Sequence, residues 1–247
     1  RAKLVRQTKR SRSMITPATQ HPPAAGFLEF LGRWPWYGAL PTELQRLILD
    51  TTVERSAAAG DYIARAGEPC THWYGPMRGF LQMYVVGADG AETTLDCLRE
   101  VQWGGEGSLL KKELRRYDLR ALTPAHIFMV PTQTFETLRR SSIEFNQFLC
   151  DIMNERMGVF VGMLAASRLL GPELRVARGL LMLAGTQDAQ ELLIPQHELA
   201  LICGLSRQRV NIAISELKRL GLVRSEVHKG IVLVDLARLR AYVMEAG

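Results

Sequence analysis

Apolar and polar residues change their spacing along the chain, and these changes divide it into parts. Between residues 53 and 130 the apolar positions fall in short alternating runs separated by glycines, which is typical of strands joined by turns. The run at residues 80–86, a Gly/Asp turn at 87–90 and a return run at 92–95 predict a β-hairpin. A helical spacing at residues 41–49 predicts a short helix before this β-rich part.

Beyond residue 131 the glycines thin out and the apolar positions recur at helical intervals. This spacing predicts a single helix of about 25–30 residues. A helix this apolar needs surfaces to pack on, so we expect one face to cover the β-rich part and another to pair with a second copy of the chain. Pro172, directly after Gly171, predicts the end of this helix and a hinge between two domains. The residues expected between the two copies are Phe145, Leu149, Ile152, Val159 and Met163.

The segment at residues 196–235 carries the most specific pattern in the chain. Gly204 can adopt the left-handed conformation that ends one helix in a tight turn, and Ser206 can cap the helix that follows. Two short apolar runs, at 222–227 and 230–235, predict a pair of strands behind this helix pair. Cap, glycine turn and strand pair in this order predict a winged helix-turn-helix.

The second helix of this motif has one apolar face and one face with the side chains that read DNA. Arginine can pair with guanine, and glutamine or asparagine with adenine, each pair adding about 1–3 kcal/mol of discrimination. At the tip of the predicted wing, Lys229 can reach a phosphate. The alternative is an amphipathic helix pair with a solvated polar face. The polar face of the second helix consists of Arg207, Gln208, Asn211, Ser215 and Lys218.

The charge of the chain is concentrated at its N-terminus. Six cations and no acid lie before Glu29, and without them 25 Lys and Arg balance 25 Asp and Glu, so the net charge of +6 belongs to this segment. We expect residues 1–26 to form a flexible basic tail with a weak attraction for a polyanion or an anionic ligand. A tail that only aids solubility is an equally good interpretation.

The 247 residues, of which 47% are hydrophobic and 23% charged, are typical of a folded soluble protein of one or two domains. No apolar run approaches the roughly 20 residues that cross a bilayer, and the basic start does not resemble a secretory signal, so we expect no membrane contact and a cytoplasmic location. No catalytic, metal-ligand or phosphate-loop pattern is present, which disfavours an enzyme. The cysteines, expected to be buried thiols in a reducing compartment rather than disulfides, are Cys70, Cys97, Cys150 and Cys203.

The stretch at residues 102–120 has the parts of an anion pocket. Its glycines leave backbone N–H groups accessible, Glu106 supplies one carboxylate, and the pair Arg115 and Arg116 follows some ten residues later.

The order of these parts, and four matching segments, resemble the Crp/Fnr family of bacterial transcription regulators from about residue 27 onward. The segments are residues 60–68, the turn at Gly79, the pair Gly105 and Glu106, and residues 204–211. The resemblance implies an α+β protein with an N-terminal, jelly-roll-like β-roll sensor domain, a long dimerisation helix and a C-terminal winged helix-turn-helix. The implied bounds are a tail at 1–26, the sensor domain at 27–140, the helix at 141–170 and the DNA-binding domain at 171–247.

The resemblance also implies the partners and the roles of the DNA-binding residues. A homodimer would bind a palindromic operator in double-stranded DNA and act on RNA polymerase. Arg207, Gln208 and Asn211 would read bases, while Ser206, Arg209 and Lys229 would contact phosphates. A regulatory module whose winged helix contacts another protein is the alternative.

The effector stays open between three alternatives. Family members that bind cyclic AMP have Gly-Glu and then Arg-Ser, but here Arg116 or Tyr117 replaces the small hydroxyl residue after the arginine. Phe160 and Val161 replace the polar residues that meet adenine. Two adjacent arginines suit a further phosphate, which favours a cyclic dinucleotide such as cyclic di-GMP. The other two alternatives are a cyclic mononucleotide (cyclic AMP or cyclic GMP) and the absence of any nucleotide effector. No cofactor is therefore certain. The candidate effector residues are Gly105, Glu106, Gly107, Ser108, Arg115 and Arg116.

Overall fold

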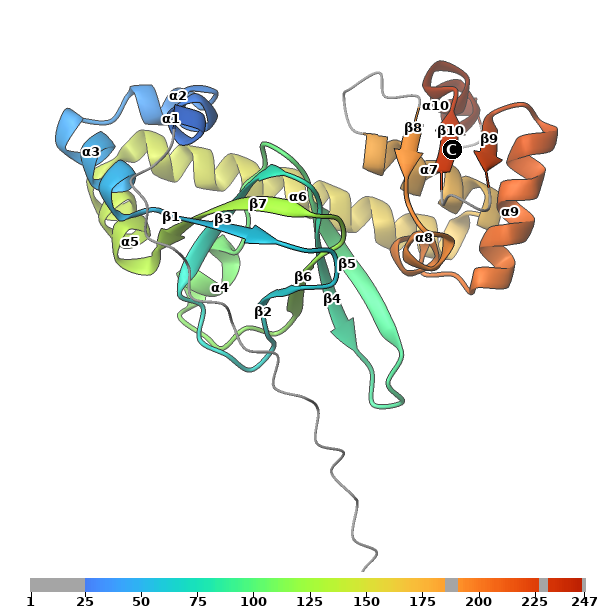
Figure 1. Cartoon of the computed structure of the whole chain (residues 1–247), viewed down its shortest axis with the longest axis horizontal. Coiled ribbons are helices and arrows are strands. Elements are labelled where there is room, and N and C mark those ends of the chain that lie inside the picture. The colour runs from blue at the N-terminus through green and yellow to red at the C-terminus, as the bar shows by residue number, and fades with distance from the viewer. Residues whose placement is uncertain (1–24, 185–190, 227–230, 246–247) are drawn as a thin grey trace, which may run out of the picture.

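The computed structural model describes residues 25–184, 191–226 and 231–245. One long helix, α6 (Ile143–Leu169), runs along the β-rich domain and reaches the mostly helical C-terminal domain at its far end (Figure 1). The basic tail and the wing tip with Lys229 lie outside the described residues. This arrangement agrees with the α+β fold expected from the sequence.

The β-rich domain consists of two antiparallel sheets, one with strand order β1-β7-β3 and one with strand order β2-β6-β4-β5. The predicted hairpin is confirmed as β4 and β5, which are joined by a turn that contains Gly90 at φ +83°. A positive φ of this kind is unstrained only for glycine. The strands are β1 (Val53–Ala57), β2 (Tyr62–Ala64), β3 (His72–Arg78), β4 (Leu81–Val86), β5 (Glu92–Leu98), β6 (Asp118–Ala121) and β7 (Ala125–Pro131).

Helices close one end of this domain over an aromatic core. Two of them, α1 (Ala25–Gly32) and α2 (Pro35–Gly38), were not predicted, and they bury Phe30 and Trp36 against the sheet. In the centre, the rings of Trp73 and Trp103 stack with their centroids 3.7 Å apart. The remaining helices of the domain are α3 (Thr42–Thr51), which was predicted, α4 (Glu106–Lys111) and α5 (Thr132–Ser141).

The long helix was predicted correctly in length but not in the face that it buries. It is α6 (Ile143–Leu169), a helix of 27 residues. Phe145 and Leu149 are 0% and 3% exposed and pack into the aromatic core, and Ile152 is partly buried against the same core. The expectation that Phe145 and Leu149 contact a second chain is therefore corrected, because the aromatic core of their own domain already covers them, whereas Ile152 keeps a partly exposed side chain.

A different face of α6 is exposed. Four apolar side chains follow one another at steps of four, three and four residues, and each exposes between 37% and 61% of its surface. This is the spacing of the a and d positions of a coiled coil. Of the residues predicted for the dimer interface, Val159 lies beside this face and is 39% exposed, and Met163 is half-buried. The exposed seam consists of Met153, Met157, Phe160 and Leu164.

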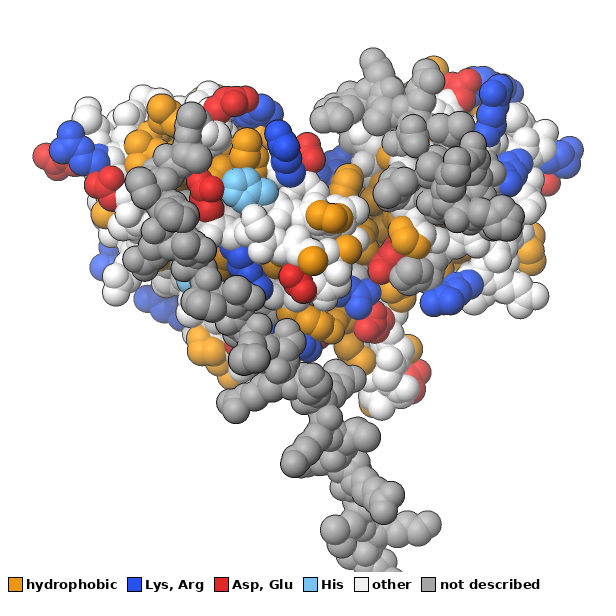
Figure 2. Space-filling model, viewed as in Figure 1, with side chains coloured by type: hydrophobic (Ala, Val, Ile, Leu, Met, Phe, Trp, Pro, Cys, Tyr) orange, Lys and Arg blue, Asp and Glu red, His pale blue; other side chains and the backbone are white. Residues whose placement is uncertain are grey.

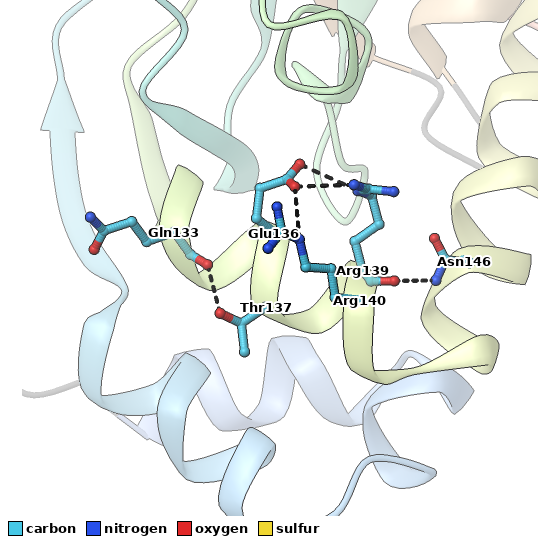
Figure 3. A network of polar contacts seen from close by, with 6 residues as sticks. All are labelled: Gln133, Glu136, Thr137, Arg139, Arg140 and Asn146. Carbon is cyan, nitrogen blue, oxygen red and sulfur yellow. Dashed lines mark hydrogen bonds and ion pairs between the residues drawn. The ribbon is translucent and has the colours of Figure 1, made fainter.

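Polar contacts fix the corner between α5 and α6 (Figure 3). The Asn146 side chain donates to the backbone oxygens of Arg139 and Ser142, and Ser142 caps α6 by accepting from the Phe145 N–H at 3.1 Å. On the outer side Glu136 pairs with Arg139 at 3.1 Å, and a hydrogen bond from that arginine lowers the pKa of the carboxyl. The direction in which α6 leaves the β-domain is thus set by several contacts at its first turn.

The C-terminal domain has its own core, formed by four helices and a small sheet of order β8-β10-β9. As predicted, α6 ends before Gly171 and a new helix begins at Pro172. The strand β8 and the helix α10 were not predicted. The elements are α7 (Pro172–Ala184), β8 (Glu191–Leu193), α8 (Gln196–Cys203), α9 (Arg207–Arg219), β9 (Val223–Glu226), β10 (Ile231–Val234) and α10 (Leu236–Glu245).

The cysteines differ from the expectation in one respect. All four are free thiols, and Cys97 and Cys203 are buried, but Cys70 is half-buried and Cys150, on α6, is exposed. No helix in the described ranges is long and apolar enough to span a membrane.

The burial of Phe145 leads to a stability prediction. Phe145→Ala removes a fully buried ring that contacts Trp36, Trp73 and Phe135, and we expect it to lower the free energy of unfolding by about 3–5 kcal/mol. Ile143→Ala is the matched control, since Ile143 lies in the same helical turn but is 73% exposed, and it should cost less than about 0.5 kcal/mol. Urea unfolding followed by tryptophan fluorescence measures both. Equal losses would contradict the assignment of Phe145 to the core.

Candidate functional site

The turn between α8 and α9 has the geometry that the sequence predicts for a helix-turn-helix. Gly204 ends α8 in the left-handed conformation, at φ +59°, and the Ser206 hydroxyl caps α9 by accepting from the Arg209 N–H at 3.3 Å. Arg175 of α7 donates to the backbone oxygens of Cys203 and Gly204 at 2.7 and 3.0 Å. The turn is therefore locked to the body of the domain.

The two faces of α9 separate as the sequence predicts. Val210, Ile214 and Leu217 are buried in the domain core. Most of the polar residues are exposed, although Lys218 is half-buried and the Ser215 hydroxyl donates to the Asn211 backbone oxygen at 2.9 Å. Besides the cap residue Ser206, which is also exposed, the exposed side chains of the expected DNA-binding set are Arg207, Gln208, Arg209, Asn211 and Ser215. They form one contiguous surface, which we call the recognition face.

Other features of the C-terminal domain suit a nucleic-acid partner. Ile212 is 58% exposed beside the recognition face. Figure 2 shows Lys and Arg side chains around the outer edge of this lobe. The strands β9 and β10 pair as an antiparallel hairpin next to α9, which is the body of the predicted wing.

The stretch that resembles an anion pocket lines a real cavity in the β-domain. The cavity has a volume of about 280 Å³ and lies between β4, β5, the segment at residues 104–108 and α6. Gly105 at φ +96° turns the chain into the short helix α4. Five of the six predicted effector residues line the cavity, and these are Gly105, Glu106, Gly107, Ser108 and Arg116.

Glu106 is buried in the cavity wall and is already paired with a cation. The residue is 3% exposed, and Arg156 of α6 donates to its carboxylate. The same guanidinium donates to the Trp103 backbone oxygen at 2.7 Å and lies 3.3 Å from the Asp96 carboxylate. Burial raises the pKa of the Glu106 carboxyl, and the Arg156 charge opposes that rise. Arg156 thus ties α6 to the cavity.

The two adjacent arginines point in different directions. Arg115 is 2% exposed and does not line the cavity. Its guanidinium donates to the Cys70 thiol at 2.8 Å and to the hydroxyls of Tyr74 and Tyr117 at 3.2 Å. Arg116 lies at the cavity edge, where it pairs with Glu113 at 2.9 Å and its side chain is 78% exposed. The pair therefore does not form a double cationic clamp.

Sequence reasoning missed Arg156, and it named Phe160 and Tyr117 only as departures from the family pattern. Arg156 and Phe160 line the cavity from α6, and Tyr117 stands between the cavity and Arg115. An arginine within a largely apolar helix indicates a polar partner nearby. Only the structure shows that this partner of Arg156 is the Glu106 carboxylate. The rest of the cavity wall is largely apolar, with Met83, Leu95, Leu98 and Leu119.

Comparison with known proteins agrees with both parts of this description. Residues 54–142 match the family model of the cyclic nucleotide-binding domain, and residues 174–242 match that of the Crp-like helix-turn-helix domain. No curated protein matches the sequence.

Solved structures of transcription regulators share the fold. A putative regulator of the Crp/Fnr family from Eubacterium rectale is 19% identical, with a TM-score of 0.69 over 86% of this chain and 99% of its own. A CRP/FNR family regulator from Thermus thermophilus is 26% identical, with a TM-score of 0.65 over 78% and 100%. The c-di-GMP responsive global regulator CLP from Xanthomonas campestris is 18% identical, with a TM-score of 0.64 over 78% and 99%.

The two family models match the β-domain and the helix-turn-helix domain on either side of α6, and together they cover more than half of the sequence. The chain therefore belongs to the Crp/Fnr family of transcription regulators.

Proposed function

We propose that the protein is a homodimeric, sequence-specific DNA-binding regulator whose affinity for its operator is controlled by a small anionic effector in the β-domain. The recognition face of α9 is the observation that carries the DNA-binding part. Its arginine, glutamine and asparagine side chains are exposed on a helix whose other face is anchored in the domain core. These are the groups that make bidentate contacts with base edges in the major groove.

The seam of α6 supports the homodimer. Burying four exposed apolar side chains on a second copy of the same helix would remove them from water, and their a and d spacing suits two parallel helices. A two-fold axis along α6 would place two recognition faces at the same end of the dimer. Half-sites of a palindromic operator about 34 Å apart would then meet one face each. Such a regulator would act in the cytoplasm, with RNA polymerase as its further partner.

Arg115 supports an anionic effector. The groups that accept its hydrogen bonds among the described residues are a thiol and two hydroxyls, all neutral, and its Nε has no hydrogen-bond partner there. A buried guanidinium without a counter-ion is costly, so a phosphate that displaced the Tyr117 hydroxyl would gain a strong charge-assisted bond. This favours an effector that carries phosphate.

Size and charge favour a cyclic mononucleotide over a cyclic dinucleotide. The cavity of about 280 Å³ is at or below the lower end of the roughly 300–1,000 Å³ typical of ligand pockets. Arg115 and Arg116 diverge, so they do not offer one site for two phosphates. Relatives are described both as c-di-GMP responsive and as putatively cAMP-binding, which makes the dinucleotide a necessary comparison.

The ligand-independent alternative also has a specific observation in its favour. Glu106 and Arg115 already have partners within the chain, in Arg156 and in Tyr117 with its neighbours. Of their side-chain polar atoms, only the Glu106 Oε2 and the Arg115 Nε lack a hydrogen-bond partner among the described residues, and a polar site that is largely satisfied internally can hold its shape without a ligand.

The DNA-binding proposal predicts a change in base preference. Arg207→Ala should lower affinity for the selected operator by about 1–3 kcal/mol and flatten the preference at one position, because a bidentate base contact is lost. Arg219→Ala is the control, since Arg219 lies at the other end of the same helix and pairs with Glu216, and it should leave the preference unchanged. Selection from random operator pools followed by gel shifts measures both. Equal losses on specific and random DNA for Arg207→Ala would contradict the proposal, and no selective binding by the parent would favour the protein-contact alternative.

The dimer proposal predicts the effect of a charge on the seam. Leu164→Glu would bring two carboxylates together at the two-fold axis, and we expect it to give monomers at micromolar concentration in sedimentation velocity. Leu169→Glu is the control, since Leu169 is 80% exposed at the end of the same helix but off the a and d positions, and it should remain dimeric. A dimer that persists in Leu164→Glu would exclude the seam as the interface.

The effector proposal predicts the outcome of calorimetry with cyclic AMP, cyclic GMP and cyclic di-GMP. A mononucleotide should bind, and Arg115→Gln should weaken it by about 1.5–3 kcal/mol, the value of a hydrogen bond to a charged group. Arg116→Gln should have little effect, because Arg116 is a surface residue paired with Glu113. Binding of cyclic di-GMP with equal losses in both variants would instead assign the dinucleotide. If none of the three binds the parent, the ligand-independent alternative holds and the DNA-binding proposal is unaffected.

A further inference from the structure

The helix-turn-helix domain is docked on the outer face of the sheet that carries the effector cavity. Helix α8 packs against β5 (Figure 1). Cys97 of β5 is 3% exposed and belongs to the core of the C-terminal domain, and Phe80 and Leu122 pack against that same core. Arg99, just after β5, donates to the Met182 backbone oxygen near the end of α7 at 2.8 Å. The two domains therefore share an apolar contact with polar contacts at its edge.

One side chain links the two domains through a chain of polar contacts. Arg120 of β6 is 3.7 Å from the Glu198 carboxylate on α8, and these side chains are only 17% and 14% exposed. Within the sensor sheet, Arg120 pairs with Glu92 at 3.1 Å and its Nε donates to the Gln82 side chain at 2.7 Å. Gln82 is fully buried and donates in turn to Thr94 at 2.7 Å.

The position of Arg120 in this network is well defined. Its guanidinium also lies 4.5 Å from the centre of the Tyr84 ring, at a distance typical of a cation–π contact. Gln82, Glu92 and Tyr84 of its own sheet hold the Arg120 guanidinium in place. The side chain has therefore lost most of its rotamer freedom before it meets the other domain. Its contact with Glu198 therefore costs less side-chain entropy than an ordinary surface ion pair.

The strand that carries Arg120 also lines the effector cavity. Successive side chains of a strand point to opposite faces, and Leu119, the residue before Arg120, is 1% exposed and lines the cavity. The same alternation holds in β5, where Leu98 lines the cavity and its neighbour Cys97 packs on the C-terminal domain. A shift of either strand on the cavity side must therefore move a contact with the C-terminal domain.

We propose that Arg120 is a positioning residue that holds α8 on the sensor sheet through Glu198 and so couples the cavity directly to the DNA-binding domain. This route runs across the sheet, through β6, and is separate from the length of α6. The docking requires no effector, whereas the signalling role rests on the proposed function. An ion pair that is made in one arrangement of the two domains and lost in another shifts the equilibrium between them, and with it the orientation of the recognition face.

Hydrogen exchange of the full chain, without DNA or ligand, tests the docking. Arg120→Gln and Glu198→Gln should each make the backbone amides of α8 and β5 exchange roughly three- to tenfold faster, and the double variant should add little to either. Arg33→Gln, which breaks the exposed pair of Arg33 with Glu29 far from α8, is the control and should leave both elements unchanged.

Two outcomes would overturn the proposal. Additive effects in the double variant would mean that the two side chains act separately, and unchanged exchange in Glu198→Gln would mean that the ion pair does not hold α8. Glu198→Gln changes only a carboxylate oxygen at the domain boundary, so it keeps the test valid even if Arg120→Gln unfolds the sensor sheet. Because neither readout involves DNA, failure here is distinguishable from failure of the DNA-binding proposal.

Discussion

The burial of the first half of α6 in the aromatic core is the interaction on which the rest of the structure depends. Phe145 and Leu149 pack against rings from α2, β3 and α5, and the stacked pair Trp73 and Trp103 lies at the centre. Because burial of large rings is among the strongest contributions to stability, α6 is fixed to the β-domain at one end. Its remaining length must then project toward the C-terminal domain (Figure 1), which determines what each of its faces can meet.

Three functional features follow from that single placement. Arg156 is brought to Glu106, so that the cavity is closed by a cation of the helix rather than of its own loop. The seam that starts at Met153 turns outward, where a second chain can reach it. The C-terminal domain is carried to the outer face of the β2-β6-β4-β5 sheet, where Arg120 meets Glu198. The cavity, the seam and the domain boundary therefore all depend on where α6 is fixed.

The accuracy of the sequence predictions follows the range of the interactions involved. The turn at Gly204, the Ser206 cap and the hairpin at residues 87–90 were correct because each depends on neighbours within a few residues. The short helices α1 and α2 were not predicted, since only the core that they cover stabilises segments of this length. In the stretch at residues 102–120 the residues near Glu106 line the cavity, but the opposite directions of the two arginines could not be predicted from their adjacency.

By itself, the sequence determined the order of the elements, the two domains, the helix-turn-helix with its recognition face, and a cavity around Glu106, because periodicity, caps and turns are local properties. Only the tertiary structure decided which side of α6 is buried. That helix is apolar on more than one side, so its spacing identifies apolar residues but not their partners. The pairing of Arg156 with Glu106 and of Arg120 with Glu198 was decided in the same way, since residues far apart in sequence meet only when the cores on either side of them have packed.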